Sequence, residues 1–401
     1  MAKARQRGTM RQRGVHWDLR AYVGVGPNGK PQFLYKTVNG KEPFARRALH
    51  DLVDKADALG SARQKSGGRT VGALLDTCIK RHGPHWSPRT LGTHRHCRSR
   101  YLSALCDLPL EDLTPDKVSA HYGKLLTGEI TGEPLAPATV VRAHNFLRRC
   151  CQSAFEWGWM TSNPASNIRI PRPRPAEPVL PVDGRQIAGV VKMVASGDTK
   201  HRPDSKFALA IQIAALTGMR RGELCGLRWS DIDWEQSAVT IQRGVVNGEL
   251  LDGTKSIIVR EAPKTHRSNR TISVSAQLVD SLKAAHEEAN AVADACGVVC
   301  ARGAYVLSDD PAGSTCWSPA RITRRWGRSR NRLGLEDVDW HCFRHYHISY
   351  LLRSGVSIQD VAKRAGDSEK TIMQIYAHAI PSQDQRSAAL ISQDYYDLPT
   401  G

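Results

Sequence analysis

The sequence is poor in acidic and aromatic residues and contains no long apolar run. Its 401 residues include 39 Asp and Glu against 57 Lys and Arg, and only 6% are Phe, Trp or Tyr. The most apolar segment, Phe207 to Leu216, is interrupted by Gln212 and is too short to span a membrane. The basic N-terminus, Met1 to Arg5, is followed by no apolar stretch, so we expect no signal peptide. These absences argue against a secreted or membrane-spanning protein and favour a cytoplasmic one.

The cysteines lack the spacing of a structural metal site. Ten Cys are scattered along the chain without one C-x-x-C pair. Cys296 and Cys300 lie one helical turn apart and would be able to share a metal ion, but no second ligand pair accompanies them. Reduced thiols in a cytoplasmic protein are the alternative. We therefore expect neither a metal nor a cofactor.

The excess of basic residues predicts a polyanionic partner. The formal charge is +18 and the pI is about 9.7. Nucleic acid is the simplest such partner, because phosphates neutralised by the protein release their counterions. A protein of the membrane surface would need an amphipathic basic helix or a lipidation signal, and we find neither. Residues 1–67 hold fourteen Lys and Arg against five Asp and Glu, a net +9 that is half of the total charge.

The basic N-terminal region, residues 1–67, has the pattern of a small sheet followed by one helix. The signals are strand patterns at Trp17–Val23 and Gln32–Val38, turns at Pro27–Lys30 and Asn39–Gly40, and an amphipathic helix at Glu42–Leu59. Such a unit, with two or three strands, is able to lay its sheet against a DNA groove. The alternative is a solvated basic arm without a specific target.

The remaining chain length predicts one or two more domains, in a multidomain and mainly α protein. A polar linker is expected at 61–69, and residues 70–168 read as all-helical, with Pro at the helix starts Pro88, Pro115 and Pro137. Five prolines between Ile168 and Gly184 indicate an extended linker, residues 169–183. Residues 184–395 form a larger domain. It is expected to begin with a helix at Asp204–Thr217 and a second helix that ends near Trp229. Strands at 238–243, 256–262 and 270–274 should form a small antiparallel sheet, and helices should follow from Ser275 onward.

Side chains suited to phosphate chemistry lie in this last domain. Arg220 follows a Thr-Gly break at a helix start, and His341 and Arg344 point the same way from another helix. Guanidinium groups donate bidentate hydrogen bonds that match phosphate. Lys264 in a hairpin suits a general acid, His341 a proton shuttle and Tyr376 an oxygen nucleophile. Taken singly, each residue is more often a surface group or an ion-pair partner.

The order of these residues resembles that of the tyrosine recombinase or phage integrase family. The matching motifs are Thr217–Leu224 with Leu227–Asp233, Pro263–Thr265, His341–His345, Gly366–Ser368 and Thr371–His378. The resemblance covers about residues 180–380. Because five motifs occur in the family's order, it is specific.

The resemblance implies a mechanism. It implies that Arg220 and Arg344 hold the scissile phosphate, that Lys264 protonates the leaving 5′ oxygen and that His341 acts as acid and base. Tyr376 would attack to give a 3′-phosphotyrosine, which a DNA 5′-hydroxyl reseals without ATP or metal. Glu223, outside this set, resembles the family's buried structural acid, and we expect it to be ion-paired and not catalytic.

Asp367 departs from the family pattern. The family usually has His or Trp after the glycine that corresponds to Gly366, where it donates to the phosphate. The nine-residue offset to Tyr376 matches the family spacing, so we interpret Asp367 as a substitution at a catalytic position. A carboxylate repels a phosphodiester unless it is neutralised. Our hypothesis is that Asp367 holds a neighbouring Arg, Lys or His in place and contacts phosphate only indirectly.

The resemblance also implies an architecture and partners. Residues 1–67 resemble a three-stranded arm-binding domain, 70–168 a SAM-like helical core-binding domain, and 184–395 a mixed α+β catalytic domain. The implied partners are double-stranded DNA with core and arm attachment sites, a homotetramer on DNA, and a DNA-bending or directionality accessory factor. No membrane partner is expected.

The function that follows is that of a site-specific recombinase of the phage integrase type. It would integrate, and also excise, a mobile element such as a viral genome. One alternative is a DNA-binding regulator that keeps the fold but has lost strand exchange, which only Asp367 favours. Another is a topoisomerase-like relaxing enzyme, against which the arm-like N-terminal domain argues.

Overall fold

The structure is a computed structural model that describes residues 8–25, 30–171, 183–198, 202–261, 269–300, 303–380, 388 and 391–393. The chain divides into two compact units. Unit 1 comprises Met1–Pro175 with Glu249–Thr254, and unit 2 comprises Ala176–Gly248 with Lys255–Gly401. In the part of the chain that is described, no helix is both long and apolar enough to cross a membrane.

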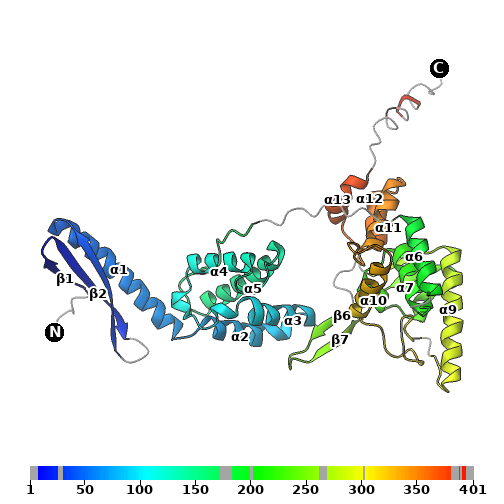
Figure 1. The fold of residues 1–401 in the computed structure, drawn as a ribbon, viewed down its shortest axis with the longest axis horizontal. Coiled ribbons are helices and arrows are strands. Elements are labelled where there is room, and N and C mark those ends of the chain that lie inside the picture. The colour runs from blue at the N-terminus through cyan, green and yellow to red at the C-terminus, as the bar shows by residue number, and fades with distance from the viewer. Residues whose placement is uncertain are drawn as a thin grey trace, which may run out of the picture. The chain divides into compact units, whose positions relative to one another are not determined.

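The N-terminal part of unit 1 is a three-stranded antiparallel sheet covered by a long helix (Figure 1). Its elements are β1 (Gly8–Arg13), β2 (His16–Val25), β3 (Pro31–Asn39) and α1 (Glu42–Ser66). Alternate residues of β2, including Leu19 and Ala21, pack against Leu52 and Ala56 of the helix. The predicted sheet and helix are confirmed, and β1 is a strand that the sequence pattern did not locate.

The polar linker predicted at 61–69 is wrong over its first six residues. Helix α1 continues to Ser66, because Ala62, Gln64 and Lys65 are good helix formers despite their polarity. It ends only at Gly67 and Gly68, whose φ angles of 56° and 72° favour glycine. The turn predicted at Pro27–Lys30 falls mostly on residues 26–29, outside the described residues.

The rest of unit 1 is helical, as predicted. Its α-helices are α2 (Val71–His82), α3 (Pro88–His96), α4 (Pro115–Thr127) and α5 (Pro137–Glu156). The side chains of Thr70, Ser87 and Thr114 cap the first three of them. Proline stands in the first turn of α3, α4 and α5, where its missing N–H leaves no bond unmade.

Unit 2 surrounds one central buried helix with further helices and two small sheets (Figure 1). Its helices are α6 (Gly184–Ser196), α7 (Ser205–Thr217), α8 (Arg221–Cys225), α9 (Ala276–Ala295), α10 (Pro319–Arg332), α11 (Cys342–Arg353), α12 (Ile358–Ala365) and α13 (Glu369–Tyr376). Strands β4 (Ile232–Asp233), β5 (Ala238–Ile241) and β8 (Arg270–Ser273) form an antiparallel sheet, and β6 (Gly244–Glu249) pairs with β7 (Lys255–Arg260). Helix α7 is apolar on nearly every side, which explains its central position.

Three details of unit 2 differ from the prediction. The helix expected to reach Trp229 ends at Cys225, because Gly226 interrupts it and the chain continues through a 3-10 turn at Trp229–Asp231. Strand β6 was not predicted, since its sequence has two glycines and little alternation. Strands β5 and β8 pair antiparallel as predicted, but β7, which was expected in the same sheet, pairs with β6 in a separate ribbon. Most of the predicted linker 169–183 lies outside the described residues, which resume at Asp183.

Candidate functional site

Two glycine turns in unit 2 bring together the segments that carry the candidate residues. Gly218 ends α7 and Gly366 ends α12, both in the left-handed conformation with φ of 65° and 67°. A Cβ on Gly218 would lie 2.7 Å from Cδ2 of His347, and one on Gly366 would lie 2.6 Å from Nη1 of Arg270. Glycine is therefore required at both turns for conformation and for space.

Arg344, on the first turn of α11, is buried between these two turns. Its side chain is only 5% exposed. Nη1 donates to the carbonyl oxygen of Gly218 at 2.6 Å, and Nη2 donates to that of Ala365 at 2.8 Å. The same Nη2 donates to Oδ2 of Asp367 at 2.5 Å. The guanidinium therefore joins the end of α7 to the end of α12.

Arg220 approaches the same carboxylate from the other side and is more open. Its side chain is 35% exposed. Nη2 donates to the carbonyl oxygen of Gly366 at 2.8 Å and to Oδ1 of Asp367, and Nη1 donates to Oε1 of Glu223 at 2.9 Å. Each oxygen of Asp367 is thus bound by a different arginine. We call Arg220, Arg344 and Asp367 the arginine–aspartate bridge.

Glu223 supports the bridge from behind through a further arginine, Arg270 of β8. Oε2 of Glu223 accepts from Nη2 of Arg270 at 2.9 Å and from the backbone N–H of Arg220 at 3.0 Å. Nε of Arg270 donates to the carbonyl oxygen of Arg364 at 2.8 Å. Arg270 was not predicted from the sequence. The sequence signal that could have identified it is its position two residues before Ile272, on the buried face of the same strand, where an unpaired charge is not tolerated.

The two carboxylates are ionised because arginines surround them. Burial alone would raise the pKa of Asp367, but Arg344 and Arg220 outweigh it and hold this pKa below its ordinary value. For Glu223, burial is likewise outweighed by Arg270 and then Arg220, so its pKa is also lowered. At neutral pH both groups are charged partners of the arginines.

Replacing Glu223 with Gln is expected to destabilise unit 2. The change removes the charge that compensates Arg270, whose side chain is 5% exposed, and breaking such a buried pair costs roughly 3–5 kcal/mol. Because the folded-state pKa of Glu223 is lowered, its contribution is present above the ordinary value of 4.5 and is lost as pH falls through the folded-state pKa. Urea unfolding of the parent and variant should therefore differ at pH 7 and converge in acid. Glu287→Gln, at an exposed position of α9, is the matched control, and an equally stable Glu223 variant would contradict this role.

Tyr376, the last residue of α13, lies buried beside two histidines. Tyr376 is 3% exposed. Its ring centroid lies 5.4 Å from the ring centroid of His345, and the ring centroid of His345 lies 5.7 Å from that of His341. Burial raises the pKa of Tyr376 to about 12, although Arg344 and Arg220 act to lower it and Asp367 adds to the rise. The phenol is therefore protonated at neutral pH. His345 was given no role from sequence, and its spacing of four from His341 on one helix was the signal for this contact.

Both histidines are uncharged near neutral pH. Desolvation of the ring lowers the pKa of His341, and its neighbours His345 and Arg344 lower it further. Burial also lowers the pKa of His345. A lowered pKa leaves both imidazoles neutral at pH 7, with a free ring nitrogen for a proton.

The segment that carries the arginine–aspartate bridge and Tyr376 matches a known protein family. Residues 190–383 match the phage integrase family. The chain is 25% identical over 289 residues to a tyrosine recombinase XerC-like protein of Caldanaerobacter subterraneus, a match that spans 70% of this chain and 71% of the relative. It is 24% identical over 377 residues to a putative prophage phiRv2 integrase of Mycobacterium tuberculosis, over 92% of this chain and 91% of the relative. Residues 190–383 therefore form a phage integrase domain.

Solved structures show the same fold for this chain. The integrase of transposon Tn1549, solved with a circular intermediate DNA, aligns with a TM-score of 0.62 and 16% identity over 81% of this chain and 99% of that one. A lambda integrase tetramer bound to a Holliday junction aligns with a TM-score of 0.55 and 16% identity, over 96% and 97% of the two chains. At this identity the likeness establishes a multidomain integrase fold of helices and small sheets.

The structure brings most of the predicted site residues together. Arg220, Arg344 and Asp367 are in direct contact, and both arginines act electrostatically on Tyr376. His341 reaches the tyrosine only through His345. Lys264 was also predicted to belong to the site, but it lies at 262–268, outside the described residues.

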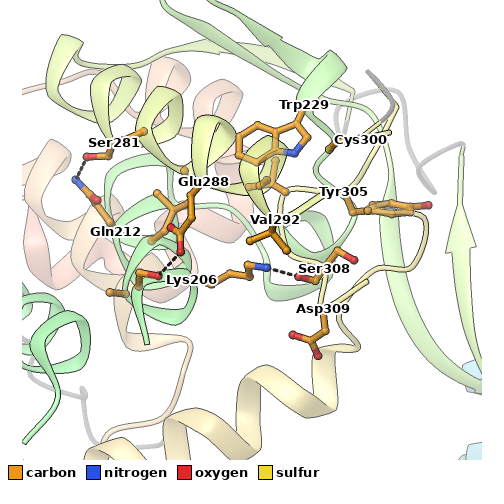
Figure 2. A pocket seen from close by; sticks show the side chains of 18 of the residues that line it. Lys206, Gln212, Trp229, Ser281, Glu288, Val292, Cys300, Tyr305, Ser308 and Asp309 are labelled. Atoms are coloured by element: carbon orange, nitrogen blue, oxygen red, sulfur yellow. Dashed lines mark hydrogen bonds between the residues drawn. The ribbon is translucent and has the colours of Figure 1, made fainter. Parts of the chain in front are cut away.

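A separate cavity of about 300 Å³ lies between α7, α9 and the chain around residues 305–313 (Figure 2). None of its lining residues belongs to the arginine–aspartate bridge. Nζ of Lys206 donates to the carbonyl oxygen of Ser308 at 2.5 Å, and Nε2 of Gln212 donates to Oγ of Ser281 at 3.2 Å (Figure 2). Because these lining polar groups bind one another, we assign no ligand to this cavity.

Proposed function

We propose that this protein is a site-specific DNA recombinase of the integrase type, which cuts and rejoins double-stranded DNA through a covalent bond at Tyr376. The observation that carries this proposal is the pairing of Arg220 with Arg344 within electrostatic range of a buried tyrosine. Two fixed guanidiniums bind the two non-bridging oxygens of a phosphodiester and stabilise the charge that develops during displacement at phosphorus.

In the proposed reaction, the oxygen of Tyr376 attacks the scissile phosphorus and the bond to the 5′ oxygen breaks. The phenol loses its proton, for which neutral His341 is the proposed acceptor by way of His345, and the leaving 5′ oxygen gains one from Lys264. Attack by a DNA 5′-hydroxyl on the phosphotyrosine reverses these steps and reseals a strand. Asp367 holds Arg220 and Arg344 in position and is not itself a phosphate ligand in this scheme.

We assign each region a role on DNA. Residues 184–395 carry the chemistry, residues 70–168 hold the core site and residues 1–67 bind the arm site. Residues 169–183 connect the domain at 70–168 with the domain at 184–395. The N-terminal sheet supports its assignment, because the guanidinium carbon of Arg20 lies 3.4 Å from the ring centroid of Phe33 and Tyr35 is 71% exposed. A basic and aromatic sheet surface suits contact with a DNA groove.

Helix α10 is the part of unit 2 that we propose to contact the DNA backbone. Six of its fourteen residues are arginines. Arg324 and Arg328 are exposed, and within the described ranges no ion pair engages them, whereas Arg325 and Arg332 bind Asp204 and Asp198. Two exposed arginines four residues apart lie on one side of a helix, which suits neighbouring phosphates.

A double replacement of Arg324 and Arg328 with Ala is expected to weaken DNA binding at all sequences. Each lost phosphate contact should reduce the slope of log K against log salt by about 0.9, so the slope should fall by about 2. Titrations of labelled DNA at several NaCl concentrations measure the slope. Lys192→Ala with Lys283→Ala removes two exposed charges from α6 and α9 and serves as the control. An unchanged slope in the α10 variant would reject this contact surface.

The partners proposed here extend those of related integrases. Lambda integrase has been solved as a tetramer on a Holliday junction, and we propose that four copies of this chain likewise assemble on two duplexes. An accessory factor that bends DNA or sets the direction of recombination is part of the same proposal.

The second candidate function is a DNA-binding regulator without strand exchange. The ion pairs of Asp367 with both arginines favour it.

A nicked suicide substrate separates the two functions. Direct repeats that flank the integrated element identify the attachment site, and a nick close to the scissile phosphate lets the cleaved fragment diffuse away. A recombinase then accumulates as a covalent protein–DNA adduct that resists denaturation by detergent. A regulator binds the same DNA in a gel-shift assay without an adduct, and that result would overturn the proposal.

The pH profile of adduct formation is expected to show an acid limb below pH 6.5. His341 accepts a proton only when it is neutral, and its pKa is lowered from 6.5, so activity should persist at pH 6.5 and fall as pH drops further. Tyr376, with a pKa of about 12, remains a phenol throughout this range and adds no limb of its own. Initial rates at constant ionic strength provide the test. His341→Gln should remove the limb, and a midpoint above 6.5 would exclude His341 as the acceptor.

A further inference from the structure

The carboxylate of Asp367 binds the two arginines in the manner of a phosphate group. Oδ1 accepts from Nη2 of Arg220, and Oδ2 accepts from Nη2 of Arg344 at 2.5 Å. A phosphodiester has the same arrangement of two equivalent anionic oxygens on one atom, and guanidinium groups bind both kinds of anion through the same donors. The place between these two Nη2 atoms is therefore filled by an anion that the protein itself supplies.

We propose that Asp367 is an internal anion that occupies the phosphate position between Arg220 and Arg344 in the DNA-free protein and competes with the phosphodiester for it. This inference rests on the proposed function, since it assumes that the two arginines bind the scissile phosphate. It assigns Asp367 a role in specificity beyond that of holding the arginines in place. DNA enters only when its other contacts with the protein offset the displacement of the carboxylate.

The two contacts of Asp367 differ in how easily they yield. Arg344 is 5% exposed and is enclosed by the turns at Gly218 and Gly366, whereas Arg220 is 35% exposed. The phosphate therefore enters from the side of Arg220, and the contact between Arg220 and Asp367 is broken first. A contact with solvent on one side is more readily exchanged than one within the protein.

The guanidiniums keep other partners when the carboxylate leaves. Arg344 still donates to the carbonyl oxygens of Gly218 and Ala365, and Arg220 still donates to that of Gly366 and to Glu223. These four contacts suffice to keep both guanidinium planes oriented. The position is thus preformed for an anion whether or not Asp367 fills it.

Charge at the site changes by one unit with this residue. Arg220, Arg270 and Arg344 supply three positive charges, and Glu223 and Asp367 supply two negative ones, which leaves +1. With a neutral residue at 367 the sum is +2. An incoming phosphate therefore meets a weaker field than the same arginines would otherwise create. Burial is the main cause of the raised pKa of Tyr376, and the charge of Asp367 adds to it.

Sulfate binding to the DNA-free protein tests this competition. The probe is sodium sulfate, compared with sodium chloride at equal ionic strength, and the readout is the thermal unfolding temperature, which rises when an anion binds the folded state. Asp367→Asn keeps the shape and removes the charge. Loss of the competing carboxylate is expected to lower, by roughly 10-fold to 100-fold, the sulfate concentration that raises the unfolding temperature by a given amount. Asp360→Asn, on the exposed first turn of α12, is the matched control and should behave as the parent does.

The outcomes separate this inference from the proposed function. Stronger sulfate binding by Asp367→Asn, lost again when Arg220→Ala is added, supports competition. Equal binding in parent and variant, or weaker binding in the variant, would overturn it and leave Asp367 as a positioning residue only. Asp367→Ser, tested in parallel, decides the matter if the Asn variant does not fold. The proposed function is tested independently by the covalent adduct, which parent protein forms or fails to form whatever the sulfate result.

Discussion

Replacement of Tyr376 with Phe is expected to abolish the covalent protein–DNA adduct while leaving the fold and DNA binding intact. The adduct requires the phenol oxygen as the nucleophile, and phenylalanine has no atom to replace it. Among the described residues no hydrogen bond to the Tyr376 hydroxyl is found, so its removal leaves no partner unsatisfied and should cost less than the roughly 0.5–1.5 kcal/mol of a typical hydrogen bond. This variant has the largest expected effect on activity for the smallest expected effect on structure.

The measurement is detergent-resistant adduct on the nicked substrate, alongside gel-shift affinity and urea unfolding. Tyr350→Phe is the control, because Tyr350 is 55% exposed on α11 and takes no part in the site. An adduct that persists in Tyr376→Phe would show that another nucleophile is used and would remove Tyr376 from the mechanism.

Replacement of Arg344 with Ala is expected to lose both activity and stability, whereas Arg220→Ala should lose mainly activity. Arg344 is buried and its removal leaves three acceptors without this donor, including Asp367, which is a loss of roughly 3–5 kcal/mol for a broken buried ion pair. Arg220 is more exposed, and Asp367 keeps Arg344 when it is removed. Each arginine should contribute about 10²–10³-fold to the cleavage rate as a donor to the developing charge.

Urea unfolding and single-turnover cleavage of the two variants provide the comparison. Lysine at 344 should not restore the parent properties, since one ammonium cannot reach the three acceptors with the fixed geometry of a guanidinium. Arg353→Ala, in the exposed last turn of the same helix, is the control for loss of an arginine from α11. Equal stability of the Arg220 and Arg344 variants would show that burial does not distinguish their roles.

Much of the architecture could be predicted because local signals determine it. Proline after Ser87 and Thr114 begins two helices where expected, and the apolar pattern from Phe207 to Thr217 gives the buried helix α7. The failures also have local causes. Helix α1 extends through polar residues that favour helix as strongly as apolar ones, and β6 contains two glycines that hide its strand character.

The sequence by itself determined the kind of chemistry: its motifs place Arg220, His341, Arg344 and Tyr376 in the order of a tyrosine recombinase, and they mark Asp367 as a departure. Only the tertiary structure decided how these groups meet. Asp367 binds both arginines, Arg270 supports them through Glu223, and His345, not His341, contacts the tyrosine ring. The physical reason is that ion pairs between residues 23, 47 and 147 positions apart depend on how separate segments pack, which no local pattern records.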